Sequence, residues 1–110
     1  MVAYLLPKQT VVGSNPITRF VIEEIMPEIS RFYGIVIFMN YKDHLPPHFH
    51  ARYQGQEVTI EIQTGIVKGR MSRRALRMLF EWSERYREAL MENWERARAR
   101  QPLEKIPPLV

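Results

Sequence analysis

The stretch HFHARYQGQEVTIEIQ, residues 48–63, determines the architecture that we expect for this chain. Basic or imidazole side chains alternate with apolar or aromatic ones along its first half. On a strand, His48, His50 and Arg52 therefore face one way, and the residues between them face the other. The second half alternates in the same way, and the pair Gln54–Gly55 between the halves predicts a turn. The stretch therefore predicts an antiparallel hairpin with one buried and one wet face.

The segments on either side extend this hairpin into a meander. Upstream, the nearly continuous apolar run Tyr33–Tyr41 predicts a buried strand. Pro46 and Pro47 lack amide donors and fix φ, so the chain between the two strands must turn or run as a stiff link. Downstream, Thr64–Gly65 predicts a second turn, and Ile66–Gly69 can add a short fourth strand.

The remainder of the chain, from Ser72 to about Arg100, predicts one long helix. Ser72 is a favourable N-cap, and Gln101–Pro102 ends the helical pattern. The apolar stripe of the helix consists of Leu76, Leu79, Tyr86, Leu90 and Trp94, widened by Ala75, Trp82 and Ala97. The fold that we expect is therefore α+β: a small antiparallel β-meander of three or four strands packed against one long C-terminal α-helix.

The composition restricts the class of protein. A chain of 110 residues forms one domain at most, and the absence of cysteine excludes a disulfide framework, a thiolate nucleophile and a cysteine zinc site. No apolar run reaches the roughly 18 residues of a membrane span, and the N-terminus lacks the pattern of a signal peptide. We therefore expect a cytoplasmic protein without membrane contact. The net charge of +4 suits nucleic acid or an acidic protein as partner, and it suits equally a solvated surface that is basic without a partner.

All three histidines of the chain lie close together in the sequence. His48 and His50 are two residues apart on a predicted strand, so their rings share a face and their backbones lie about 7 Å apart. His44 can close on them across the Pro-Pro link, and Asp43 can supply a carboxylate. The candidate metal ligands are therefore Asp43, His44, His48 and His50, a donor set that suits Zn²⁺ or another divalent transition metal such as Fe²⁺.

The same histidines also have two interpretations that need no metal or other cofactor. A neutral imidazole can take a proton from an RNA 2′-hydroxyl, and an imidazolium can give one to the leaving oxygen. With Arg52 to stabilise the phosphorane charge, His48, His50 and Arg52 are candidate catalytic residues of a small metal-independent ribonuclease. In the structural interpretation, the histidines hydrogen-bond turn carbonyls or face water. The sequence leaves all three interpretations open.

Basic residues gather where the predicted helix begins. Cations at a helix N-terminus oppose the macrodipole, so such a cluster is better tolerated when an anion binds there. Free backbone amides, a serine hydroxyl and arginine side chains together can hold a phosphate. Alternatively, the arginines pair with Glu57 or Glu61 on the polar face of the hairpin. The candidate phosphate-binding residues are Arg70, Ser72, Arg73, Arg74 and Arg77.

Three stretches carry a resemblance to a known family: ISRFYGI (29–35), DH with PPHFH (43–50) and RRAL (73–76). With them, residues 26–102 resemble a family of small bacterial proteins catalogued as domain of unknown function 4160. The resemblance implies a compact α+β domain in a cytosolic bacterial protein. It also implies a gene that often stands beside another small uncharacterised gene, in pairs that look like toxin–antitoxin modules. It supplies neither an activity nor catalytic residues.

The resemblance also suggests how the chain is divided. The family usually begins with Met-Pro, as Met26–Pro27 does, and codons for Gly13–Pro16 resemble the T-arm of a tRNA gene. We therefore expect residues 1–25 to be an N-terminal extension: either the start is mis-assigned and Met26 is the natural initiator, or the segment is natural and Gly13–Pro16 form a β-turn. Residues 26–102 form the single α+β domain, and residues 103–110 form a Pro-rich tail, as an ordered or a trailing arm.

Three hypotheses for function follow. In the first, the protein is one component of a toxin–antitoxin-like module that acts on or binds nucleic acid, RNA in preference to DNA, together with a small cognate partner protein. In the second, it is a non-catalytic adaptor or antitoxin that binds protein or DNA. In the third, it is a metalloprotein with a histidine cluster. Whether it is an enzyme, and whether it forms homo-oligomers, is open at this stage.

Overall fold

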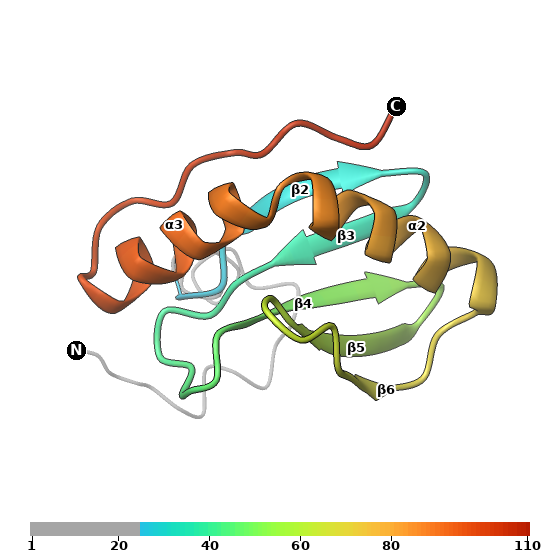
Figure 1. Cartoon of the computed structure of the whole chain (residues 1–110), viewed down its shortest axis with the longest axis horizontal. Helices are drawn as coiled ribbons and strands as arrows, with labels where there is room; N and C mark the ends of the chain where they lie inside the picture. Colours follow the sequence, from blue (N-terminus) through green and yellow to red (C-terminus); the bar gives the residue numbers. More distant parts are fainter. Residues whose placement is uncertain (1–24) are drawn as a thin grey trace, which may run out of the picture.

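The strands of this protein follow one another across a single antiparallel sheet in the order in which they occur along the chain (Figure 1). A computed structural model describes residues 25–110. The expected N-terminal extension therefore lies, apart from Ile25, outside the described residues. The elements are β2 (Glu28–Phe32), β3 (Ile35–Phe38), β4 (His48–Tyr53), β5 (Gln56–Glu61), β6 (Val67–Gly69), α2 (Arg73–Arg85) and α3 (Arg87–Arg98). The predicted α+β class and meander are confirmed, with five strands within residues 25–110 instead of three or four.

The strand expected at Tyr33–Tyr41 is shorter than predicted, and a further strand, β2, precedes it. A two-residue turn, Tyr33–Gly34, joins β2 to β3, and both of its residues have positive φ, 50° and 83°. This is the backbone of a tight hairpin turn, whose twist matches that of the flanking strands. Gln54 and Gly55 repeat it between β4 and β5, with φ of 49° and 79°, which confirms the predicted turn there.

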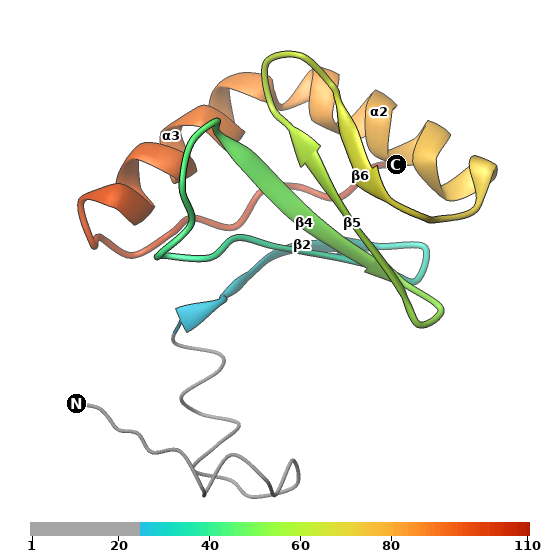
Figure 2. The same cartoon turned by 90° about the horizontal axis from the view of Figure 1, so that it is seen from below.

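The single long helix that the pattern predicts is interrupted at Tyr86. This residue leaves helical geometry, with φ −113° and ψ 30°, so it ends α2 and precedes α3. Neither glycine nor proline stands at the break. Instead, the Tyr86 ring packs against the Trp82 indole with centroids 5.9 Å apart, and the change of direction keeps both helices over the twisted sheet (Figures 1 and 2). Among the described residues, no helix is both long and apolar enough to cross a membrane.

The core lies between the two helices and one face of the sheet. Trp82 is fully buried, and its indole lies 5.6 Å from the Phe32 ring and 5.8 Å from the Phe49 ring, measured between centroids. Full burial of a side chain the size of phenylalanine stabilises the fold by about 2–3 kcal/mol. The other large contributors to this core are Ile35, Ile37, Val58, Ile60, Leu79, Leu90 and Trp94.

The C-terminal tail packs into this core. Ile106 and Leu109 are buried, and the Ile106 N–H donates to the Ile29 carbonyl of β2 at 2.8 Å. The side chain of Asn93, which is 1% exposed, donates to the Glu104 carbonyl and accepts from the Glu104 N–H, both at 2.9 Å. One amide thus satisfies both backbone groups of a tail residue, which fixes the tail against α3 (Figure 1).

Replacement of this amide tests the contribution of the tail. Asn93→Ala leaves the partly buried N–H and carbonyl of Glu104 without partners, so we expect the free energy of unfolding to fall by about 2 kcal/mol. Urea unfolding followed by circular dichroism measures this change. Glu95→Ala, on the exposed side of the same helix, is the control and is expected to stay within about 0.5 kcal/mol of the wild type. An Asn93→Ala protein as stable as this control would contradict a stabilising tail.

Candidate functional site

The loop between β3 and β4 carries Asp43 to the start of β4. The Asn40 carbonyl accepts a hydrogen bond from the Asp43 N–H at 3.4 Å, which turns the chain back toward the sheet. The Leu45–Pro46 bond is cis, and the carbonyl of Pro47 accepts from the Ile62 N–H at 3.0 Å. The Pro-Pro segment is therefore a turn tied to the sheet, and it places Asp43 beside the first residues of β4.

Asp43 and the two histidines of β4 meet at one oxygen atom. Oδ2 of Asp43 lies 2.8 Å from Nε2 of His50 and 3.0 Å from Nε2 of His48. The side chain of Asp43 is 16% exposed, that of His50 13% and that of His48 11%, so water reaches little of these three side chains. Their ligand atoms all lie within 4.8 Å of one another, close enough to hold one metal ion. We call Asp43, His48 and His50 the Asp43 cluster.

Each histidine of the cluster has a different environment at its other ring nitrogen. Nδ1 of His48 donates to the Pro46 carbonyl at 2.8 Å, and the His48 ring lies 5.4 Å from the Trp94 ring of α3. Nδ1 of His50 is buried and has no hydrogen-bond partner among the described residues. The carboxylate oxygen Oε2 of Glu57 lies 3.5 Å from it, and the imidazole is stacked on Phe38 with centroids 5.1 Å apart and an interplanar angle of 14°.

The other two candidates from this part of the sequence, His44 and Arg52, are not part of the cluster. His44 is exposed, and its ring centroid lies 6.2 Å from that of His48. Arg52 shares a sheet face with the histidines, as the alternation predicts. Its side chain is 58% exposed, and its guanidinium donates to Oε1 of Glu57 at 3.0 Å and lies over the Phe38 ring. The structure thus groups three of the four candidate metal ligands.

The arginines at the helix start form a separate surface. Ser72 is the N-cap of α2, and its hydroxyl accepts from the Ala75 N–H at 3.1 Å, as predicted. Within residues 25–110, no ion pair involves the four exposed arginines of this surface, and neither Glu57 nor Glu61 reaches them. Glu57 pairs with Arg52, and Glu61 accepts from Thr64. The four are Arg70, Arg73, Arg74 and Arg77.

This arginine surface and the Asp43 cluster lie at opposite ends of the fold. The cluster is at the start of β4, beside α3, whereas α2 begins at the far end of the sheet (Figure 1). The 13 residues of α2 alone span about 20 Å. A single phosphate therefore cannot contact both the Asp43 cluster and the arginine surface, although a longer polyanion can.

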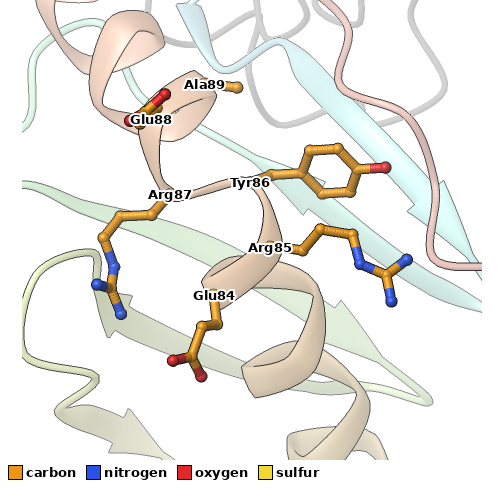
Figure 3. Close-up of a pocket in the computed structure, with 6 residues that line it drawn as sticks. All are labelled: Glu84, Arg85, Tyr86, Arg87, Glu88 and Ala89. Carbon is orange, nitrogen blue, oxygen red and sulfur yellow. The ribbon is translucent and has the colours of Figure 1, made fainter.

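An open hollow of about 570 Å³ lies where the two helices meet. Its lining comes from the junction itself, Glu84 to Ala89, and Figure 3 shows Arg85 and Tyr86 on one side of the ribbon and Glu84 and Arg87 on the other. The lining side chains are mostly exposed and charged, and none belongs to the Asp43 cluster or to the arginine surface. We therefore assign no function to this hollow.

A clear pKa shift occurs on β2, at Glu28, which lies opposite Phe38 in the pairing of β2 with β3. The hydrogen bond from Arg31 holds the pKa of the Glu28 carboxyl below its usual range; burial opposes this, and the positive charges of Arg31 and Lys105 add to the lowering. The same contact raises the pKa of Arg31. The pair joins two residues of one edge strand and has no contact with a candidate site, so we assign it a structural role.

Besides Pro46 and Trp94, which contact His48, two residues that flank His50 were not predicted as part of the site. Phe38 lies directly opposite His50 in the pairing of β3 with β4, and Glu57 lies opposite Arg52 in the pairing of β4 with β5. Both share the sheet face of the histidines. The alternation within each strand shows only which residues of that strand share a face with Phe38 or Glu57. The register between strands is needed to show that both residues flank His50.

Comparison with known proteins identifies a family without a known function. The family profile described as Domain of unknown function (DUF4160) matches residues 34–95, which is more than half of the chain. The matched region contains the Asp43 cluster and the arginine surface. Neither a curated protein nor a solved structure matches this chain. The expected resemblance is confirmed, and the chain belongs to the DUF4160 family.

Proposed function

We propose that this protein is a metalloprotein in which Asp43, His48 and His50 bind one divalent transition metal ion. The observation that carries the proposal is the convergence of two imidazole nitrogens on one carboxylate oxygen, at 2.8 and 3.0 Å. Donor atoms around a single ion, at bonds of about 2.0–2.2 Å, lie about 2.8–3.1 Å apart in octahedral geometry and about 3.3–3.6 Å apart in tetrahedral geometry. Small side-chain movements therefore convert the cluster into a coordination shell.

The hydrogen bonding of His48 supports a cation at this point. The Pro46 carbonyl only accepts, so Nδ1 of His48 must carry a proton. In a neutral imidazole, Nε2 then presents a lone pair to the Asp43 carboxylate at 3.0 Å, and the two lone pairs repel. Either a second proton on the ring or a metal ion between the two atoms removes this conflict. A carbonyl at Nδ1 is also the arrangement that orients metal-binding histidines.

The donor set favours a particular class of ion. Two imidazoles and one carboxylate suit Zn²⁺, Fe²⁺, Co²⁺ or Ni²⁺, whereas Mg²⁺ and Ca²⁺ prefer oxygen ligands. Three protein ligands also leave coordination positions for water or a substrate, as catalytic metal sites do. Such an ion would supply Lewis acidity, while the protein side chains hold and orient it.

Metal binding can be measured directly on the purified chain. After dialysis against a chelator, we expect one equivalent of Zn²⁺ or Co²⁺ to bind, as shown by atomic emission and by a rise in melting temperature. A free ion concentration of 100 times Kd stabilises the fold by about 2.7 kcal/mol, which raises Tm by about 10 °C or more in a domain of this size. Mg²⁺ should produce no such shift.

Variants of the cluster distinguish a specific site from adventitious binding. Asp43→Asn and His50→Ala should each abolish stoichiometric binding and the thermal shift, because the first replaces the anionic carboxylate by a neutral amide and the second removes a ligand atom. His44→Ala is the matched control: it removes an exposed histidine of the same loop, and we expect it to bind as the wild type does. Loss of binding in His44→Ala would instead support the four-ligand site expected from the sequence. A wild-type protein that binds no metal would rule out the proposal.

Nucleic-acid binding is a second candidate function, and the arginine surface supports it. Four exposed arginines that form no ion pair within residues 25–110 suit a phosphate backbone, with RNA in preference to DNA. The protein would act as one component of a toxin–antitoxin-like pair with a small partner protein. Ribonuclease chemistry by His48, His50 and Arg52 has less support, because the cluster and Glu57 bring carboxylates to the place where a phosphate would sit.

Fluorescence anisotropy with short RNA and DNA strands tests this second function. We expect Arg73→Ala, Arg74→Ala and Arg77→Ala together to weaken RNA binding at least tenfold at low salt. Because about three phosphate contacts are lost, the slope of log K against log salt concentration should also become less negative by about 2. Arg87→Ala with Arg98→Ala, two exposed arginines elsewhere, is the control. Equal losses in both variants would indicate general electrostatic attraction and no defined surface.

The same preparations separate the metal and acid–base interpretations. RNA cleavage that persists in a chelator and disappears in His48→Ala would support metal-independent acid–base chemistry. Cleavage that requires an added transition metal would support a catalytic metal centre.

A further inference from the structure

We infer that Glu57 is a positioning residue that fixes the imidazole of His50 for metal binding, an inference that rests on the proposed metal site. Glu57 lies on β5, directly opposite Arg52 of β4, and on the same sheet face as His50. Its carboxylate lies between two basic side chains: Oε1 accepts from Arg52 at 3.0 Å, and Oε2 lies 3.5 Å from Nδ1 of His50.

The need for such a group comes from His50 itself. A histidine that binds a metal through Nε2 carries its proton on Nδ1, and this N–H requires an acceptor that sets the tautomer and the ring orientation. Nδ1 of His50 is buried and has no hydrogen-bond partner among residues 25–110. Oε2 of Glu57 lies 3.5 Å from this nitrogen, so a movement of less than 1 Å brings the two atoms within hydrogen-bond distance.

The surroundings of His50 hold both its imidazole and the Glu57 carboxylate in place. Phe38 stacks on the imidazole at 5.1 Å and nearly parallel, which holds the ring plane. The Arg52 guanidinium lies over the same Phe38 ring and binds the other Glu57 oxygen, so Arg52 and Phe38 together keep the carboxylate beside His50. With a metal bound at Nε2 of His50, Nδ1 would carry the proton and could donate a hydrogen bond to the Glu57 carboxylate beside it.

The second ring nitrogen, Nδ1, has a different neighbour in each histidine of the cluster, and this difference makes Glu61 a control for Glu57. His48 donates to a neutral backbone carbonyl. Glu61, which lies opposite His48 in the register of β4 and β5, accepts instead from the Thr64 hydroxyl at 2.6 Å. Glu57 and Glu61 are therefore matched acidic residues on one strand and one face, and we infer that only Glu57 acts on the cluster.

Zinc affinity, measured by competition with a chromophoric chelator, tests the inference. We expect Glu57→Ala to weaken Zn²⁺ binding about 10-fold to 100-fold, as removal of an orienting acceptor does. Glu57→Gln should lose less, because its amide oxygen still accepts a hydrogen bond, and Glu61→Ala should bind as the wild type does. Thermal unfolding without metal verifies that each variant is folded.

A spectroscopic readout separates positioning from a general charge effect. In the zinc-loaded protein, nuclear magnetic resonance should show a protected, downfield Nδ1–H signal of His50, and Glu57→Ala should shift it upfield or remove it by exchange with water.

Three outcomes would overturn the inference. Equal zinc affinity of Glu57→Ala and the wild type excludes a positioning role while leaving the metal site intact. An equal loss in Glu61→Ala shows that the effect is only long-range charge. A wild-type protein that binds no metal overturns the proposed function and this inference with it.

Discussion

The register of the central strand β4 is the constraint on which the rest of the structure depends. Phe49 and Ala51 are fully buried against the helices, and β3 and β5 pair with β4 on either side. Since side chains alternate across a strand, a slip of one residue would move Phe49 to the outer face and the histidines into the core. The burial of two apolar residues therefore also fixes where His48 and His50 point.

The histidines in turn constrain the loop that precedes β4. The Asp43 carboxylate is only 16% exposed, and a charge so withdrawn from water costs free energy unless partners compensate it. Nε2 of His50 supplies a hydrogen bond to it at 2.8 Å, and the bond from the Ile62 N–H, just after β5, to the Pro47 carbonyl keeps the loop in place. A cluster held this way keeps its geometry before any ligand arrives, which lowers the cost of binding one.

Much of the fold could be predicted from local patterns, and the errors have local causes. The hairpin, its Gln54–Gly55 turn and the Ser72 cap all follow from alternation or from residue type, and all three are present. The Tyr33–Gly34 turn has the same X-Gly form as Gln54–Gly55, but it lies in an apolar run that looks like one strand. The break at Tyr86 has neither glycine nor proline to signal it in the sequence, and the Tyr86 ring packs there against Trp82.

The sequence by itself determined which residues share a face: His48, His50 and Arg52 on one side of β4, and the apolar residues on the other. It also showed that Asp43 and three histidines lie close along the chain. Only the tertiary structure decided that Asp43, and not His44, meets both imidazoles. It also decided that Glu57 and Phe38 flank His50, and that the arginines of α2 lie at the far end of the fold. The physical reason is that periodicity is a property of one segment, whereas these contacts depend on how a loop closes and on how neighbouring strands pair.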